Sequence, residues 1–440
     1  MLTRQYSPRQ RLFITLYTLL LVIPLLPLLA ACATTPGGTG TPTPGRTVAP
    51  TAGTSPTTVP MPSTLTSCPP SGTARRQVIA PLVLGSHANV VYVVNQGQGN
   101  TPHPIAGILK RYDSITGSET VMLTAPHASL EGTQVSADGQ WVLFSTRISD
   151  RSAIQVIRMD GQGLQTLYCA ASSEYIGALA WSPDQHYVAF QEGLHINLLN
   201  VVTGTYQLVM TSNLPAGYTL RTWLDNTRLY MTSYGATETP PLNLYLLDIK
   251  TNKIQQVLNS STLCGDFDRS IESTRLFTSE CRFAMPVTEG PSRILVQPAT
   301  GGQATTIYST PTYAITALRV ASPTTLLFTI HNTGVDGIDT SHNGLWKVNA
   351  DSTDLTRLSS ESADEATIFT YTRSLNSTVS LDSESYAVQV IRYSTPSSGT
   401  IAPSLSSSLL IGSLNGENPV TVTTLARTDG AIEVVGWTRM

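Results

Sequence analysis

The chain has 440 residues, a formal net charge of −3 at pH 7, and only 12% charged residues. Four lysines occur in the whole sequence, at positions 110, 250, 253 and 347, so no basic surface for nucleic acid is expected. The length exceeds that of one ordinary compact domain, which favours several domains or a repeat architecture.

The N-terminal segment has the pattern of an export signal. Three arginines precede an apolar run at residues 12–29, and small residues stand immediately before Cys32. We therefore predict a lipoprotein signal peptide over residues 1–31 and a diacylglycerol-modified Cys32. The alternatives are an ordinary signal peptide and an uncleaved anchor, which Pro24 and Pro27 make a poor membrane span. The predicted location is the extracytoplasmic face of the cell membrane, held by acyl chains.

Residues 32–72 have the composition of a tether. Between positions 34 and 62, 22 of 29 residues are Thr, Pro or Gly, so this stretch offers almost nothing to bury in a core. We predict that it separates the lipidated cysteine from a folded region at residues 73–440.

Three kinds of segment then recur along the folded region about every 50 residues. Each has the alternation of apolar and polar residues that is typical of strands. The first kind ends in a polar turn, at residues 134–139, 178–185, 220–226 and 317–324, and more weakly at 268–273 and 369–375. The second kind follows at residues 141–145, 187–191, 228–232, 282–287, 326–330 and 386–391. The third kind is a pair of short strands joined by a tight turn, at residues 154–161, 196–204, 244–252, 294–302, 345–351 and 409–416.

The two ends of the folded region complement each other. It begins with a second-kind strand, residues 90–95, and finishes with a first-kind strand, residues 431–438. Six internal repeats and this split one predict an all-β fold, a seven-bladed β-propeller of four-stranded antiparallel blades. The C-terminal strand is expected to complete the first blade and close the ring.

Two repeats carry a family resemblance. The segments SADGQWVLF (136–144) and WSPDQHYVAF (181–190) resemble the repeats of TolB-like propellers, also described as PD40 or WD40-like repeats. The resemblance covers residues 89–440 at the level of the fold, and the smaller α/β domain that precedes the propeller in TolB has no counterpart in it. It implies an extracytoplasmic binding platform whose partner is not specified.

Four cysteines remain after Cys32 is assigned to lipidation. An even number in an exported chain favours disulfides, and three connectivities are possible. We favour a local Cys264–Cys281 pair, which leaves Cys68–Cys169 to fasten the end of the tether near the second and third blades. Free buried thiols are the alternative.

No reaction motif stands out. The sequence lacks a nucleophile elbow, a zinc-binding H-E-x-x-H helix, a phosphate-binding loop and an EF-hand, so no catalytic residue, metal or cofactor is predicted. Asp138 and Asp184 occupy the same turn position in successive repeats and are expected to bond turn backbone. The five tryptophans, at positions 141, 181, 223, 346 and 437, are expected to pack between blades.

One face of the ring is the expected site of function. Connections from second to third strand, and from each blade to the next, should emerge on the same face, and the former are long at residues 96–106, 233–241, 332–343 and 394–406. The densest polar cluster lies in one of them: His331, Asp336, Asp339 and His342. It is either a candidate binding-face loop or a solvated loop without a ligand.

The sequence therefore predicts a monomeric, membrane-anchored propeller that acts as a binding or scaffold module for a protein or glycan. Two alternatives stay open. One is a carbohydrate-active enzyme, a lyase or glycosidase, with loop residues around the central channel. The other is a surface spacer without a specific ligand. Paired carboxylates over the channel would favour a glycosidase, whereas a broad aromatic face would favour binding.

Overall fold

We describe the protein from a computed structural model. The described residues are 68–70, 74–77, 80–97, 106–148, 151–170, 175–212, 217–234, 242–259, 263–280, 292–332, 339–369, 377–394, 404–416 and 419–440. Within these ranges every regular element is a β-strand. The same residues include no helix that is long and apolar enough to cross a bilayer.

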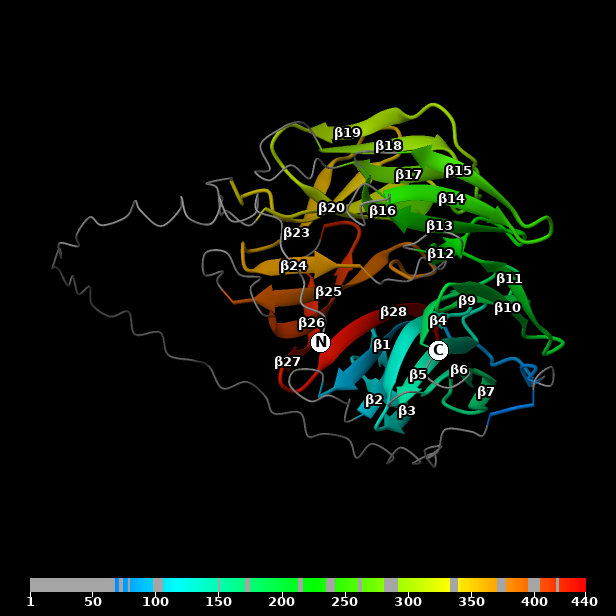
Figure 1. Cartoon of the computed structure of the whole chain (residues 1–440). Coiled ribbons are helices and arrows are strands. Elements are labelled where there is room, and N and C mark those ends of the chain that lie inside the picture. The colour runs from blue at the N-terminus through cyan, green and yellow to red at the C-terminus, as the bar shows by residue number, and fades with distance from the viewer. Residues whose placement is uncertain are drawn as a thin grey trace, which may run out of the picture. The chain divides into compact units, whose positions relative to one another are not determined.

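The strands form seven four-stranded sheets, the blades (Figure 1). Blade 1 consists of β28 (Ala431–Arg439), β1 (Ala88–Gln96), β2 (Ala106–Asp113) and β3 (Glu119–Pro126). Blade 2 consists of β4 (Ser129–Val135), β5 (Trp141–Ile148), β6 (Arg151–Arg158) and β7 (Gln165–Cys169). Blade 3 consists of β8 (Ile176–Trp181), β9 (Tyr187–Glu192), β10 (His195–Asn200) and β11 (Tyr206–Thr211).

The remaining blades repeat this order. Blade 4 consists of β12 (Thr219–Trp223), β13 (Arg228–Tyr234), β14 (Leu242–Asp248) and β15 (Lys253–Asn259). Blade 5 consists of β16 (Leu263–Arg269), β17 (Arg275–Glu280), β18 (Ser292–Pro298) and β19 (Thr305–Thr310). Blade 6 consists of β20 (Ile315–Val320), β21 (Thr325–Ile330), β22 (Gly344–Asn349) and β23 (Thr356–Ser360). Blade 7 consists of β24 (Glu365–Ile368), β25 (Ser385–Tyr393), β26 (Ser404–Ser413) and β27 (Val420–Ala426).

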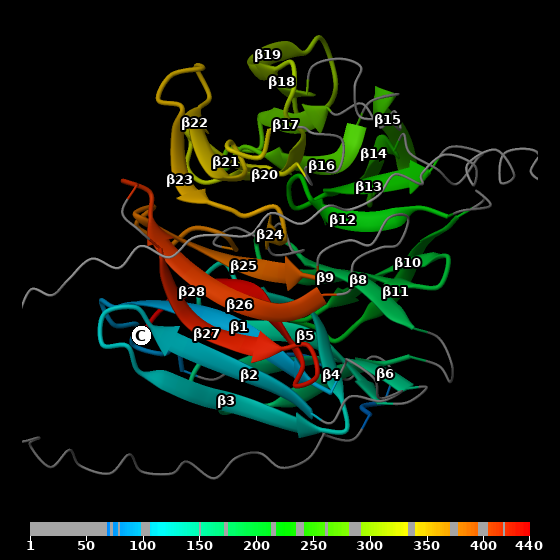
Figure 2. The ribbon, with the colours of Figure 1, turned by 90° about the vertical axis from the view of Figure 1, so that its left-hand side faces the viewer.

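The ring closes as predicted, because the last strand completes the first blade. β28 pairs antiparallel with β1 over its whole length, from Ala88 opposite Arg439 to Asn95 opposite Ala431. Figures 1 and 2 show the red C-terminal strand lying beside the blue N-terminal one. Trp437, fully buried, packs with residues of blade 7 and donates its Nε1 hydrogen to the Thr378 carbonyl at 3.1 Å. The predicted seven-bladed fold is confirmed.

The apolar residues explain why the blades stack. Seven hydrophobic clusters form among the described residues, and each one joins two consecutive blades around the ring. The second strand of a blade is buried on both faces, as in β5, because it packs against both neighbouring blades. Trp141 and Trp181 belong to the cluster between blades 2 and 3, and Trp223 belongs to the next one. Burial of these clusters supplies the main driving force for the fold.

A repeated turn connects the first and second strands of several blades. In blades 2, 3 and 7, a serine and an aspartate two residues later bond to each other and to backbone N–H groups of the turn. The Ser136–Asp138, Ser182–Asp184 and Ser380–Asp382 oxygens are 2.5–2.6 Å apart. The fourth turn residue has a positive φ in all three, and glycine, at Gly139, adopts it at least cost. The structural role predicted for Asp138 and Asp184 is confirmed.

Two blades differ from the prediction in where their strands lie. In blade 5 the first-kind segment at residues 268–273 holds the end of β16 and its turn, as predicted, but the second strand is β17, whereas the sequence pattern placed it at residues 282–287. In blade 7 the first strand is β24, and the predicted segment at 369–375 begins after it. The predictions were wrong because the second strand was sought too late in blade 5 and the turn was sought too early in blade 7. The turn serines are Ser270 and Ser380, which accept hydrogen bonds from Arg275 and Ser385.

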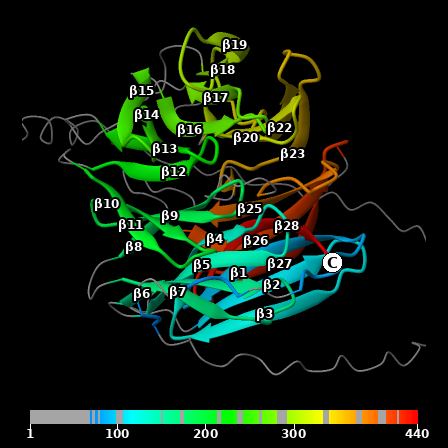
Figure 3. The same cartoon turned by 90° about the vertical axis from the view of Figure 1, so that its right-hand side faces the viewer.

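A strap, formed by the described residues 68–70, 74–77 and 80–87, fastens the beginning of the folded region to blades 2 and 3. Cys68 and Cys169 form a disulfide, with 5.8 Å between their Cα atoms. Arg76 donates its backbone N–H to Val201 at 2.7 Å, and its guanidinium lies 5.3 Å from the ring centre of Trp141. Gly204 allows this close approach, because a Cβ there would lie 2.9 Å from the backbone nitrogen of Ala74. Figure 3 shows blades 2 and 3 from the right-hand side of the view in Figure 1.

The other predicted disulfide joins Cys264 to Cys281. Cys264 belongs to β16, and Cys281, which follows β17, lies outside the described residues. Leu263 and Glu280 are opposite each other in that strand pair. The Cys264–Cys281 bond therefore stays a prediction.

Candidate functional site

The connections of blade 6 define a face of the ring. His331, which follows β21, donates its backbone N–H to Ala314, just before β20, at 3.1 Å. Glu361, which follows β23, donates its backbone N–H to Asn343 at 3.1 Å. The two ends of the connection between β21 and β22 thus lie against the connections to both neighbouring blades, as the sequence predicted.

Two asparagines close the neck of this loop. Asn332 donates its backbone N–H to Oδ1 of Asn343 at 2.9 Å, and Nδ2 of Asn343 donates to the Asn332 carbonyl at 2.8 Å. Both are buried, and Oδ1 of Asn332 also accepts the Ala314 N–H at 3.2 Å. Because each amide satisfies buried backbone groups, the two ends of the loop are held at a fixed separation.

Planar side chains stack beyond the neck. The rings of Tyr313 and His342 lie 4.2 Å apart with an interplanar angle of 26°, and those of His342 and Trp346 lie 6.2 Å apart at 9°. The Arg357 guanidinium lies 5.9 Å from the centre of Trp346. These four residues are the blade 6 stack. Trp346 donates its Nε1 hydrogen to the His342 carbonyl at 2.9 Å, which fixes the histidine against it.

Asp339 adds a carboxylate to the edge of the stack. It accepts hydrogen bonds from the Ser341 backbone at 2.8 Å, the Ser341 hydroxyl at 2.7 Å and the Tyr313 hydroxyl at 3.3 Å. The Ser341 bonds hold the pKa of Asp339 below its usual value. The Asp339 and His342 side chains are 56% and 44% exposed, so this preformed arrangement is open to a partner.

His331 does not join the stack. Its Nδ1 lies 2.6 Å from Oε1 of Glu361, whose other oxygen accepts the backbone N–H of Thr367, in blade 7, at 2.7 Å. The His331 side chain is 19% exposed and that of Glu361 is 2% exposed. This pair ties blade 6 to blade 7. The predicted cluster is therefore divided: Asp339 and His342 stand together, His331 is a link between blades, and Asp336 lies outside the described residues.

Sequence reasoning missed a pair of carboxylates in the first strands of blades 1 and 2. Glu433 and Glu131 are each the third residue of their strands, β28 and β4. Glu131 accepts hydrogen bonds from Ser129 at 2.7 Å and from Tyr175 at 2.5 Å. Burial and the Glu131 charge raise the pKa of Glu433 to about 7. The signal was a glutamate at the same position of two aligned first-kind strands.

No cluster of three or more His, Cys, Asp or Glu side chains is arranged to hold a metal in the part of the chain that the structure describes. The described turn aspartates and four of the five tryptophans are part of the framework. Trp346 is the exception, because it packs partly against the core between blades 5 and 6 and partly within the blade 6 stack.

Comparison with known proteins identifies a fold and nothing finer. No protein-family model matches the chain, and no curated protein matches its sequence. Among solved structures, acylaminoacyl peptidase in complex with a chloromethyl ketone is 11% identical, with a TM-score of 0.50 over 76% of this chain and 50% of the peptidase. TolB from Acinetobacter baumannii is 14% identical, with a TM-score of 0.43 over 80% of this chain and 82% of TolB. The putative TolB from Agrobacterium tumefaciens is 13% identical, with a TM-score of 0.39 over 81% and 99% of the two chains.

Proposed function

We propose that the protein is a binding module, held at the extracytoplasmic face of the cell membrane, whose partner docks on the face that carries the blade 6 stack. The blade 6 stack is the observation that carries this proposal. Its partner is a protein or a glycan.

The chemistry of the stack suits recognition. Tyr, Trp and Arg supply the anchor residues of many interfaces, because planar groups give large contact areas at a small loss of conformational entropy. Here they are positioned before a partner arrives, since the Asn332–Asn343 neck fixes the two ends of the loop and Trp346 fixes His342. Preorganised sites lose less entropy on binding.

The membrane anchor rests on sequence alone. Cys32 lies outside the described residues, and the pattern before it is the argument for lipidation. Cys32→Ser is expected to move the protein from the membrane fraction to the soluble fraction after export and to abolish fatty-acid labelling. Unchanged labelling would contradict the anchor and leave the binding proposal standing.

Point substitutions test the binding face better than a loop deletion, because removing residues 332–343 would destroy the buried neck. Detergent-solubilised native membranes should be passed over the immobilised protein, over a Tyr313→Ala, His342→Ala variant, and over a Val202→Ser control. Val202 is 52% exposed in the turn between β10 and β11, away from the stack. Protease treatment of a second membrane sample distinguishes a protein partner from a glycan.

A partner retained by the native protein and the control, and retained at least 10-fold less by the double variant, would support the proposal. Equal retention by all three proteins, or no retention above a bare matrix, would contradict it. Matching thermal unfolding midpoints of the three proteins establish that the variant is folded.

A further inference from the structure

Part of the strap, residues 74–77, lies in a groove between blades 2 and 3. Gln165, the first residue of β7, contacts it from blade 2, and Val201, which follows β10, contacts it from blade 3. Both residues stand at turns between third and fourth strands, and these turns emerge on the face opposite to the blade 6 stack. The groove is therefore separate from the proposed docking face.

Three hydrogen bonds hold the backbone of the strap in this groove. Arg76 donates its backbone N–H to the Val201 carbonyl at 2.7 Å. The Gln165 side chain accepts the backbone N–H of Gln77 at 3.0 Å through Oε1, and its Nε2 donates to the Arg75 carbonyl. Because all three bonds use main-chain groups of the strap, another peptide in the same conformation can form them.

The side chains of the strap alternate between the ring and the solvent. Ala74 is 4% exposed and Arg76 is partly buried, whereas Arg75 and Gln77 are exposed. A period of two is typical of an extended chain that lies on a surface. The backbone of Ala74 is so close to Gly204 that a Cβ on this glycine would lie 2.9 Å from the Ala74 nitrogen. The groove therefore favours a small residue at position 74.

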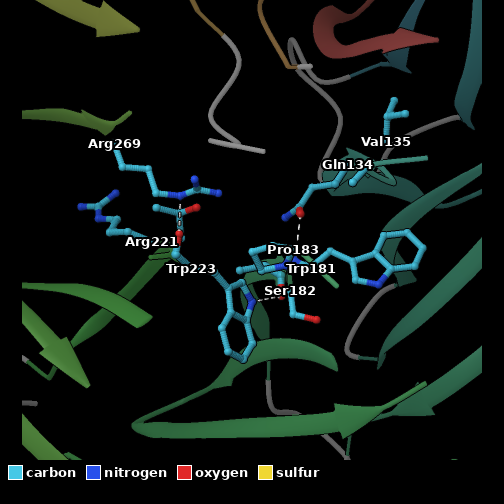
Figure 4. A pocket seen from close by; sticks show the side chains of 11 residues that line it. Gln134, Val135, Trp181, Ser182, Pro183, Arg221, Trp223 and Arg269 are labelled. Atoms are coloured by element: carbon cyan, nitrogen blue, oxygen red, sulfur yellow. Dashed lines mark hydrogen bonds between the residues drawn. The ribbon is translucent and has the colours of Figure 1, made fainter. Parts of the chain in front are cut away.

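Arg76 places its guanidinium beside two tryptophans, one from each blade. Its Cζ lies 5.3 Å from the ring centre of Trp141 and 6.0 Å from that of Trp181, which are distances of cation–π contacts. Figure 4 shows the Trp181 indole directed away from Arg221 and Arg269. Both indoles belong to the cluster between blades 2 and 3 and are 6% and 8% exposed with Arg76 in place.

The two indoles bind the guanidinium without a carboxylate bonded to it. Nη1 of Arg76 is buried and has no hydrogen-bond partner among the described residues. Burial lowers the pKa of Arg76, and the charge of Asp138 opposes this decrease. A planar guanidinium suits stacking on aromatic rings better than a lysine ammonium does. The groove therefore favours a small residue followed, two positions later, by an arginine.

A disulfide keeps the strap in the groove. Cys68 is exposed, and its bond to Cys169 attaches the strap to the end of β7. A segment tethered in this way competes with a free peptide at an effective concentration on the order of 1 mM. A dithiol reductant can remove this attachment: the disulfide takes up two electrons and two protons and becomes two thiols, while the reductant is oxidised to its own disulfide.

We propose that this groove is a binding site for an extended peptide with a small residue two positions before an arginine, and that the strap occupies it in cis until the strap disulfide is reduced. The arginine of the partner replaces Arg76 on the two indoles, and the backbone of the partner bonds to Val201 and Gln165. This site is additional to the docking face on blade 6 and is independent of it.

The strap itself supplies the probe. A fluorescein-labelled peptide that copies residues 74–82 is titrated by fluorescence anisotropy, beside a copy in which neutral citrulline replaces the second arginine. The opened protein is the full chain with Cys68→Ser, Cys169→Ser and Arg76→Ala. We expect saturable binding of the arginine peptide to it, and at least 10-fold weaker binding both of the citrulline peptide and of the arginine peptide to the native, disulfide-bonded protein. Equal binding of the two peptides, or no saturable binding by the folded opened protein, would overturn the proposal.

A further substitution locates the site. Gln165→Ala, added to the opened protein, removes two backbone bonds and is expected to weaken binding of the arginine peptide about 10-fold. Gln256→Ala, which changes an exposed glutamine of blade 4, should leave binding unchanged. Unchanged binding by folded Gln165→Ala would overturn the assignment. Reduction of the native protein with dithiothreitol should strengthen binding, and no change after complete reduction would contradict the role of the disulfide.

Arg76→Ala with the disulfide intact tests the two indoles even if the opened protein does not fold. Methylguanidinium should raise the thermal unfolding midpoint of this variant saturably, because it fills the space that the side chain leaves between the tryptophans. Methylurea, a neutral analogue, should not raise it, and neither compound should raise the midpoint of the native protein. Equal effects of the two compounds on Arg76→Ala would overturn the proposed guanidinium site.

Discussion

Glu433 is a residue whose charge depends on the ring being closed. It lies in β28, and the burial and the Glu131 carboxylate that raise its pKa to about 7 exist only when β28 stands beside blade 2. In the unfolded chain its pKa returns to about 4.3. Between about pH 4.3 and pH 7, therefore, Glu433 is protonated in the folded protein and ionised in the unfolded chain.

The sign of the resulting pH dependence follows from this difference. Because the folded state binds more protons, the contribution of Glu433 is fully favourable below pH 4 and is lost as the pH rises through 7. Glu433→Gln does not titrate. We therefore expect the variant to gain stability relative to the native protein, by about 2 to 3 kcal/mol between pH 5 and pH 8.

Urea unfolding of the two proteins at several pH values measures this gain. Glu131→Gln serves as the matched control, since removing the neighbouring charge should reduce the pH dependence without removing Glu433. The prediction would be refuted if the free energies of unfolding of the native protein and of Glu433→Gln differed by the same amount at every pH.

At the scale of elements, the repeated turn between the first and second strands combines a serine–aspartate bond with a residue of positive φ. Its fourth residue has φ of 69° at Gly139 and 59° at Ser383. Only glycine adopts this conformation without steric cost, while other residues lose roughly 1 to 2 kcal/mol. Ser383 is exposed, so its side chain has no packing to lose.

Ser383→Gly is accordingly expected to stabilise the protein by about 0.5 to 1 kcal/mol, after the larger backbone entropy of glycine in the unfolded chain is deducted. The reverse change, Gly139→Ser, should destabilise by about 1 to 2 kcal/mol, and its Cβ would also lie 3.0 Å from the Thr438 hydroxyl. Denaturant midpoints check both changes. Two shifts of the same sign would show that backbone strain does not govern this turn.

The same turn shows what the sequence was able to predict. Blades 2 and 3 were recognised because Ser136 and Ser182 stand at the start of well-formed repeats. The equivalent Ser380–Asp382 pair was present in blade 7 and was overlooked, since the strand before it is only four residues long. Period-2 alternation is weak in so short a segment, and the turn was the more reliable signal.

The candidate sites were less predictable than the fold. The loop of blade 6 was found because its charged residues are adjacent in sequence, but nothing in the sequence separates His331 from His342. The groove under the strap combines Gln165 of blade 2 with Val201 of blade 3, so only the ring brings them together. Such contacts depend on strand register and on the order of blades, which composition does not encode.

Across the whole molecule, side chains of one blade accept hydrogen bonds from backbone N–H groups at the edge of the next blade, where no strand pairs with them. Amide and carboxylate groups of one blade bond to the first strand of the next: Asn95 to Leu130, Gln134 to Trp181, Gln191 to Leu220, Asp268 to Val320 and Glu361 to Thr367. Thr438, in β28 of blade 1, donates its hydroxyl hydrogen to the Gly139 carbonyl of blade 2 at 2.9 Å, so the strand that closes the ring is also bonded to the next blade. These bonds satisfy backbone groups at the free edge of each sheet.

The Cys68–Cys169 disulfide should make a large contribution to the stability of the whole ring. It closes a segment with a sequence separation of 101, for which loop entropy in the unfolded chain predicts about 4 to 5 kcal/mol. Cys68→Ser, Cys169→Ser is expected to lower the free energy of unfolding by that amount. Denaturant unfolding with and without reductant measures it.

The Cys264→Ser, Cys281→Ser variant provides the comparison. If the predicted second disulfide exists, its loss should cost about 3 kcal/mol, and free thiols would give no change under reductant. If the Cys68→Ser, Cys169→Ser variant had the same unfolding midpoint as the native protein, the predicted stabilisation by loop entropy would be wrong.

The strap also decides where mechanical load enters the ring. A pull transmitted along the chain from its N-terminal side reaches the disulfide first and passes to Cys169, in the outermost strand of blade 2. The seam between β1 and β28 is thereby shielded, although β1 is the first strand along the chain. Reduction of the bond would redirect the same pull through the strap to β1. A thiol–disulfide exchange would then change the path of unfolding under tension, from the rim of blade 2 to the seam of the ring.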